Sequence, residues 1–257
     1  MFANYHTHTA RCGHACGEDR EYVEAAVRAG FTILGFSDHT PYEYPDDYVS
    51  FIRMPMDSLE EYVSSLLSLK EEYQGQIELH IGLEAEYYPR LFPHLLRRLR
   101  DLPVEYLLLG QHNLGNEYDG AYSGAPTADP ADLIQYCDQC IEGMQTGLFT
   151  YFAHPELLHF VGEPAVYDRE MRRLCREAIA CGLPLEFNLN GFRQKRYYPT
   201  ERFWQIAAEE GATVIIGSDA HNPIHVDLPA LEADARAILA KYGIIPIETT
   251  PIVNIQK

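Results

Sequence analysis

The sequence predicts an α/β protein built as a β/α barrel. Short apolar runs alternate with amphipathic segments along the whole chain, which is typical of parallel strands joined by helices. Some runs, such as residues 213–216, are apolar almost throughout, as expected of parallel strands covered on their outer face. A chain of 257 residues with 46% hydrophobic composition is large enough for one continuous core.

Seven strands are expected, each a short apolar run that ends in polar or turn residues. In chain order they cover residues 3–8, 32–39, 77–87, 105–112, 150–154, 184–190 and 213–219. Helices are expected to begin near Glu18, Asp57, Arg90, Asp129, Asp168 and Thr200. The side chains suited to cap these helices are Asp57, Asp129, Asp168 and Thr200. The helices are expected to stop at Gly30, Gly147, Gly182 and Gly211.

The last part of the chain predicts one more helix over residues 228–242 and an apolar tail over residues 244–255 that covers one end of the barrel. The long connections 40–56, 113–128 and 154–167 each follow a strand, and loops at that end of β/α barrels build active sites. No linker, internal repeat or low-complexity segment divides the sequence, so one domain over residues 1–257 is expected.

The composition limits the possible partners. The 38 acidic and 20 basic residues give a net charge of −18, which disfavours long nucleic acids and anionic membranes. A small anionic substrate is compatible with this charge if bound dications reverse the local field. The first residues lack the pattern of a signal peptide, so a soluble, cytoplasmic protein is expected. The six cysteines are too sparse for a disulfide scaffold and are expected to be reduced.

Side chains of metal-ligand type lie at or just beyond the ends of the predicted strands. His6 and His8 are two apart on a strand, so both leave the same face and can bind one ion. An isolated pair of this kind is more often a solvated strand end, but the pattern recurs. Asp219 can share the same ion because the first and last strands of a closed barrel are adjacent. The full set is His6, His8, His14, His39, Glu84, His112, His154, Asp219 and His221.

Glu84 has two carboxylate oxygens and can therefore bridge two ions. Glu86, two residues on, lies on the same face and is the alternative candidate for the bridging carboxylate. Its expected role, however, is to be solvated or to hold a ligand in place. His112 and His154 each end an apolar run, where a polar ring is costly unless something such as a metal satisfies it. Convergence at one rim would make these residues a cluster of metal sites.

These motifs resemble, in order, those of the polymerase and histidinol phosphatase (PHP) superfamily. The matching residues are His6-Thr7-His8, His14, Ser37-Asp38-His39, Glu84, His112, His154 and Asp219-Ala220-His221. The resemblance implies a distorted (β/α)7 barrel, similar to a TIM barrel, with three divalent metal ions, which could be Zn, Mn or Fe. It implies that the first ion is held by His6, His8, Glu84 and Asp219, the second by Glu84, His112 and His154, and the third by His14, His39 and His221.

Within the superfamily, the chain is most similar to the stand-alone histidinol-phosphate phosphatases, in its size and in residues 186–193. The resemblance implies hydrolysis of L-histidinol phosphate to L-histidinol and phosphate, a step of histidine biosynthesis. A metal-bridging hydroxide would be the nucleophile. Asp219, Glu84 and His39 are the expected catalytic residues.

Two groups of residues are candidates for substrate binding. A planar guanidinium can clamp a phosphate, and Arg193 is preferred here, although a solvated basic loop explains the cluster equally well. This basic cluster follows the sixth strand and consists of Arg193, Lys195 and Arg196. The amine and imidazole of the substrate require acidic partners. The rim loops offer Glu43, Glu117 and Asp119.

Other activities stay open because residues 110–115 depart from the usual histidinol phosphatase pattern. The alternative is a PHP-type phosphoesterase that acts on nucleotides, short oligonucleotides or another small phosphorylated metabolite. An amidohydrolase would be expected to carry a lysine where Gln111 and His112 stand. A barrel that keeps its metals without catalysis is the remaining alternative.

Four cysteines form pairs that resemble other kinds of site. Cys137 and Cys140 have redox-motif spacing, but they fall inside an amphipathic helix and are expected to pack there. Cys12 and Cys16 flank His14 as in a zinc knuckle. No second pair stands at a suitable spacing, so they are interpreted as loop residues near the third ion.

Overall fold

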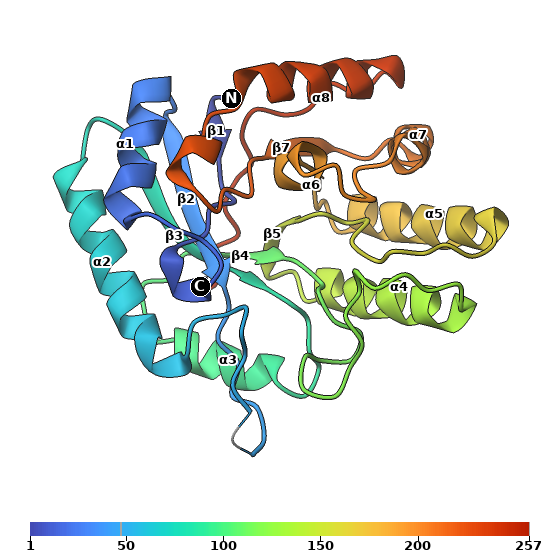
Figure 1. Cartoon of the computed structure of the whole chain (residues 1–257), viewed down its shortest axis with the longest axis horizontal. Helices are drawn as coiled ribbons and strands as arrows, with labels where there is room; N and C mark the ends of the chain where they lie inside the picture. Colours follow the sequence, from blue (N-terminus) through green and yellow to red (C-terminus); the bar gives the residue numbers. More distant parts are fainter. Residues whose placement is uncertain (47, 257) are drawn as a thin grey trace.

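A parallel sheet of seven strands forms the centre of the protein, and the helices surround it (Figure 1). The computed structural model describes residues 1–46 and 48–256. The strands pair in chain order and are β1 (Ala3–Asn4), β2 (Ile33–His39), β3 (Glu78–Ala85), β4 (Tyr106–Leu109), β5 (Phe149–Phe152), β6 (Leu185–Asn188) and β7 (Val214–Gly217). Thr7 and Ala220 form a parallel bridge between the segments that follow the first and last strands, which confirms the predicted barrel.

Helices connect successive strands on the outside of the barrel (Figure 1). They are α1 (Asp19–Ala29), α2 (Leu59–Glu72), α3 (Phe92–Leu99), α4 (Pro130–Gln145), α5 (Pro164–Ala180), α6 (Leu189–Arg193), α7 (Glu201–Glu210) and α8 (Pro229–Lys241). Three short 3₁₀ helices span Ala10–Cys12, Met56–Ser58 and Pro223–His225. Among the described helices, none has both the length and the apolar composition needed to cross a membrane.

The first residues of the helices show which of the predicted caps are correct. Asp129 and Thr200 accept backbone hydrogen bonds at the starts of α4 and α7, as predicted. The prediction for Asp168 is wrong because α5 already begins at Pro164, whose fixed φ suits the first helical turn. Asp57 lies inside a 3₁₀ helix and caps nothing. Residues 189–190, predicted as strand, belong to α6 because the Asn188 side chain caps the backbone directly after β6.

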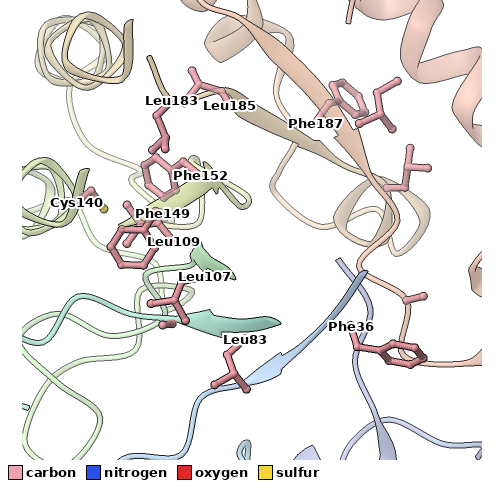
Figure 2. Packing of buried hydrophobic residues seen from close by; sticks show 14 of the residues in the cluster. Phe36, Leu83, Leu107, Leu109, Cys140, Phe149, Phe152, Leu183, Leu185 and Phe187 are labelled. Carbon is pink, nitrogen blue, oxygen red and sulfur yellow. The ribbon is translucent and has the colours of Figure 1, made fainter. Parts of the chain in front are cut away.

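The apolar core has an outer and an inner layer. Alternate residues of each strand face opposite sides, so Leu107 and Leu109 pack toward the helices whereas Tyr106 and Leu108 face the barrel interior. Figure 2 shows part of the outer layer, where Leu107 and Leu109 of β4 lie near Phe149 of β5. The inner layer consists of Ala3, Tyr5, Tyr106, Leu108, Tyr151, Ala153 and Ile215.

The C-terminal tail covers the end of the barrel where the strands begin. Ile247 donates its N–H to the carbonyl of Val214 at 2.8 Å, and the Tyr5 hydroxyl donates to the carbonyl of Thr250 at 3.3 Å. Ile247 and Ile252 pack against the inner layer of the core. The predicted cover is therefore confirmed, and it leaves the opposite end of the barrel, where the strands end, for a site.

Candidate metal centre

The nine side chains predicted as metal ligands come together where the strands end. The parallel register places His39, the last residue of β2, directly beside Glu84 of β3. The other members follow β1, β4, β5 and β7 or lie in the loop after β1, as does His14. Five overlapping groups of possible ligand atoms, each within 4.8 Å of one another, connect most of the set. We call these nine residues the metal-ligand cluster.

Four of the cluster residues have the spacing of one tetrahedral site. The Nε2 atoms of His6 and His8 are 3.2 Å apart, and each lies 3.5 Å from Glu84 Oε2. Asp219 Oδ1 lies 3.6 Å from the first ring and 3.2 Å from the second. Ligand bonds of about 2.0 to 2.1 Å in a tetrahedron place neighbouring ligand atoms roughly 3.4 Å apart. These five of the six distances among the four ligand atoms therefore fit a single ion.

The remaining cluster residues form two further groups. Glu84 Oε1 lies 2.6 Å from His154 Nε2 and 3.5 Å from His112 Nε2, so the two oxygens of Glu84 face different groups. On the other side, the Nε2 atoms of His14 and His221 are 3.1 Å apart. The Nδ1 atoms of both rings face backbone carbonyls, which accept hydrogen bonds only, so in a neutral ring Nδ1 carries the proton and Nε2 has a free lone pair. Two facing lone pairs repel each other unless a cation lies between them.

Unpartnered polar atoms and backbone strain also indicate that the cluster binds cations. Within the described part of the chain, both oxygens of Glu84, Asp219 Oδ1 and His39 Nδ1 are buried without a hydrogen-bond partner. Leaving such groups unsatisfied is costly. His154 and Asp219 also adopt positive φ angles of 33° and 47°, a conformation that side-chain-bearing residues rarely take outside functional sites. The donor set and its orphaned atoms therefore fit metal ions.

A buried carboxylate lies behind each of three cluster histidines. Glu186 Oε1 accepts from His6 Nδ1 at 2.8 Å, and Asp38 Oδ1 lies 3.3 Å from Nδ1 of His8. Glu86 Oε1 accepts from the Nδ1 of His112 at 2.8 Å and is fully buried, so it is the residue that holds a ligand in place and is not solvated. Such partners fix the tautomer and orientation of a metal-binding ring.

Glycines leave the space that two of these carboxylates need. A Cβ atom on Gly110 would lie 2.0 Å from Glu84 Oε1, and one on Gly217 would lie 1.8 Å from Glu186 Oε1. Real Cβ atoms do not approach other atoms so closely. Any larger residue at either position would therefore displace a carboxylate of the centre.

The carboxylates of the centre favour a proton on His6. Burial lowers the pKa of this histidine, but Glu186, Asp219 and Glu84 outweigh burial and raise the pKa to about 10. An imidazolium has no lone pair for a metal, so a bound ion must displace this proton.

The histidines on the other side of the cluster are ready to bind. Burial, together with His221 and His8, lowers the pKa of His14 to about 4. Burial, with His8 as the next cause, holds the pKa of His39 well below its usual range. Both rings are therefore neutral at pH 7 and offer a lone pair.

Metal uptake should release protons. We expect zinc titration of the metal-free protein near pH 7 to release at least about one proton, because His6 must lose its proton. Affinity should rise with pH and level off near pH 10, where that proton is already lost. In the metal-free protein, the same shift stabilises the fold below pH 6.5, and this contribution disappears as the pH rises through about 10. Calorimetry in buffers of different ionisation enthalpy measures the release, and zinc affinity independent of pH would contradict it.

A cleft of about 670 Å³ opens in front of the metal-ligand cluster. Its walls include Tyr48, Glu117 and Tyr122 from the loops after β2 and β4, and Arg196 and Tyr198 from the segment after α6. Of the predicted substrate-binding residues, Glu117 and Arg196 therefore line the cleft.

The other predicted substrate-binding residues do not line this cleft. Arg193 donates to Asn190 Oδ1 at 2.8 Å, and Lys195 is exposed. Glu43 borders a different, smaller cavity, and Asp119 is exposed and accepts from the Asn116 side chain at 2.5 Å. The geometry thus favours Arg196 over Arg193 as a residue that meets a ligand in the cleft.

A buried charge network connects the cleft wall to the cluster. Arg53 is 4% exposed and donates to both oxygens of Glu86, at 2.8 and 2.6 Å, and to Glu117 Oε2 at 2.5 Å. Tyr48 donates to the other oxygen of Glu117 at 3.0 Å. Because Glu86 also holds His112, the network runs from the cleft wall to the cluster.

Sequence reasoning missed Glu186, Asp38 and Arg53. The first two had a usable signal: Asp38 directly precedes His39, and Glu186 lies in an otherwise apolar strand run, where an acidic residue needs a partner. Arg53 had no such signal because it lies in an irregular loop, far in sequence from both of its carboxylates.

Comparisons with known proteins agree with this geometry. The model of the PHP domain matches residues 4–190. A protein of Deinococcus radiodurans named a probable histidinol-phosphatase is 31% identical over 227 residues, which cover 85% of each chain. The histidinol-phosphatase of Bacillus subtilis is 27% identical and aligns over 84% of this chain and 92% of its own.

A solved structure has the same fold. It is the histidinol phosphate phosphatase of Lactococcus lactis in complex with zinc, L-histidinol and phosphate. It superposes with a TM-score of 0.72 and covers 99% of this chain and 97% of its own, at 16% sequence identity. The resemblance inferred from the motifs is therefore confirmed, and the chain belongs to the PHP domain family.

Proposed function

We propose that this protein is a metal-dependent phosphatase that hydrolyses L-histidinol phosphate to L-histidinol and phosphate. The observation that carries the proposal is the metal-ligand cluster at the floor of a cleft large enough for a small phosphorylated metabolite. Relatives named histidinol-phosphatases, aligned over more than four fifths of the chain, support the choice of substrate.

We propose three divalent ions. The first would be held by His6, His8, Glu84 and Asp219, the second by Glu84, His112 and His154, and the third by His14, His39 and His221. When bound, such ions lower the pKa of water to near 7 and neutralise phosphate oxygens. Zinc, manganese and iron all suit this mixture of imidazole and carboxylate ligands.

The chain itself would position the substrate. Arg196 is the candidate in the cleft wall for a hydrogen bond to a phosphate oxygen, with Arg193 and Lys195 further along the same segment. Glu84 and Asp219 would remain ionised, because several histidines outweigh the effect of burial and hold the pKa of each carboxyl well below its usual range. With His39, whose ring is neutral, they are the proposed catalytic residues.

Another part of the cleft wall suits a cationic alcohol. Arg53 carries one positive charge between the two negative charges of Glu86 and Glu117, so the network has a net charge of 1 − 2 = −1. Of the two carboxylates, Glu117 lines the cleft. A protonated amine or imidazolium would compensate this charge, which favours histidinol phosphate over nucleotides and sugar phosphates.

A substrate screen tests the proposal. Zinc- and manganese-loaded protein should release phosphate from L-histidinol phosphate with a kcat/KM at least ~100-fold above that for nucleoside monophosphates and sugar phosphates. A preference for nucleotides or dinucleotides would instead support the phosphoesterase alternative. Absence of hydrolysis by metal-loaded protein would favour a barrel without catalysis.

The two arginines give a matched pair of variants. Arg196→Ala should raise KM about 10- to 100-fold, because a charge-assisted hydrogen bond to phosphate contributes roughly 1.5 to 3 kcal/mol. Arg193→Ala should change KM much less because Arg193 does not line the cleft and its guanidinium already donates to Asn190. Steady-state kinetics on L-histidinol phosphate measure both. A larger effect for Arg193→Ala would reverse the assignment.

A further inference from the structure

One cysteine lies against the metal-ligand cluster. Cys12 is the last residue of the 3₁₀ helix Ala10–Cys12 and is 1% exposed. Its Sγ atom and the ligand atoms of His8 and His221 all lie within 4.8 Å of one another. In the part of the chain that the structure describes, it is the one cysteine among these groups of possible ligands.

The backbone around Cys12 holds the thiol in this position. Its carbonyl oxygen accepts from His14 Nδ1 at 3.0 Å, so Cys12 contacts the third group of ligands through its main chain as well as its side chain. The neighbouring Gly13 has a φ of 79°, in the left-handed region, and turns the chain between Cys12 and His14.

A second observation at the same place points to a cation. His39, which shares a ligand group with His14 and His221, is 4% exposed, and its Nδ1 atom lies 3.1 Å from Glu84 Oε2. The Nε2 atoms of His14 and His221 face each other at 3.1 Å. Three imidazoles thus surround the place assigned to the third ion, and the Cys12 thiol lies within 4.8 Å of a ligand atom of one of them, His221, and of the neighbouring His8.

We propose that Cys12 is a ligand of the third ion, as a thiolate beside His14, His39 and His221. The inference rests on the proposed metal centre and adds a ligand to it. Binding forms a bond between sulfur and the metal, while the thiol proton leaves to solvent or buffer. Three nitrogens and one sulfur supply the four ligands of a tetrahedral zinc site.

This ligand would make the third ion different from the other two. A thiolate is a soft ligand that favours zinc over manganese, whereas the histidines and carboxylates of the other groups accept several metals. The third ion would also have a full protein shell, so it could take a substrate oxygen only by expanding to five ligands. We therefore expect zinc at this position even when manganese occupies the others.

Cobalt substitution tests the proposal without an activity assay. Protein loaded with Co²⁺ should show an intense near-ultraviolet band from charge transfer between thiolate and metal, in addition to the weak visible bands that nitrogen and oxygen ligands give. Cys12→Ser should lose the near-ultraviolet band and should release one zinc to a chelator at least ~10-fold faster. Cys16→Ser is the matched control, because Cys16 lies in the same loop, is exposed and is absent from the groups of possible ligands. This control should keep the band.

The outcomes separate this inference from the proposed function. Cobalt bound in the same amount without a near-ultraviolet band, or a band that persists in Cys12→Ser, would overturn the role of Cys12 and leave the phosphatase proposal standing. A band that depends on Cys12 supports the inference even if the protein does not hydrolyse histidinol phosphate. A Cys12→Ala variant with native circular dichroism and without the band excludes misfolding as the cause.

Discussion

Replacing Glu84 by Gln should reduce kcat by about 1000-fold or more. The carboxylate lies within 3.5 Å of His6, His8 and, through its other oxygen, His112. An amide offers one neutral oxygen where two charged oxygens stood, so at least one of the two neighbouring ions would lose a ligand. Each bound ion contributes several kcal/mol to stabilisation of the transition state, and every 1.4 kcal/mol corresponds to a factor of about ten in rate.

Metal content distinguishes this explanation from a general loss of structure. Elemental analysis of Glu84→Gln should find at least one ion fewer per chain, while circular dichroism remains native. Glu78→Gln is the matched control because Glu78 is exposed and lies at the opposite end of the same strand, away from the cluster. Full metal content and near-native kcat in Glu84→Gln would remove the bridging role.

The metal-ligand cluster could be predicted from sequence because metal chemistry restricts it to a few residue types. His6, His112 and His154 end apolar runs, and in a parallel barrel strand ends meet at one rim. The order of the strands is therefore enough to predict that these three side chains lie close together. The family resemblance added the grouping of ligands by ion, which the periodicity of the sequence did not contain.

The residues behind the ligands were harder to predict because their partners depend on three-dimensional packing. Glu186 lies on β6, whereas His6 follows β1. The two side chains meet only because the sheet closes into a barrel. The sequence shows a basic cluster but not where each of its side chains points, so it favours Arg193 as the residue that binds phosphate. Arg193 is the last residue of the short helix α6 and does not line the cleft, whereas Arg196, three residues further on, does.

Replacing Arg53 by Met should destabilise the fold by about 3 to 5 kcal/mol. The guanidinium is almost completely buried between Glu86 and Glu117, and removal of one partner of a buried ion pair leaves uncompensated charge. Methionine keeps much of the volume, so the loss of charge dominates. Denaturant unfolding of the metal-free protein measures the change, and Arg20→Met, which breaks an exposed pair with Glu72, should have little effect.

The pH dependence identifies the buried charge as the cause. Burial raises the pKa of Glu86, but Arg53 and His112 outweigh burial and lower it below its usual value of 4.5. This pairing therefore stabilises the native protein above pH 4.5, and the contribution is lost as the pH falls through the lower pKa of the folded state. In Arg53→Met the main cation is gone, so the pKa of Glu86 should rise and the deficit relative to the native protein should shrink at acidic pH.

A second substitution should recover part of the lost stability. Arg53→Met with Glu86→Gln removes the more deeply buried of the two carboxylates that would lose their partner, while the amide oxygen of Gln can still accept the hydrogen bond from His112 Nδ1. If this double variant is as unstable as Arg53→Met alone, packing and not charge explains the loss. If it regains stability and keeps its metal, Arg53 balances the charge of the carboxylate that holds His112, and the wall of the cleft is thereby coupled to the metal centre.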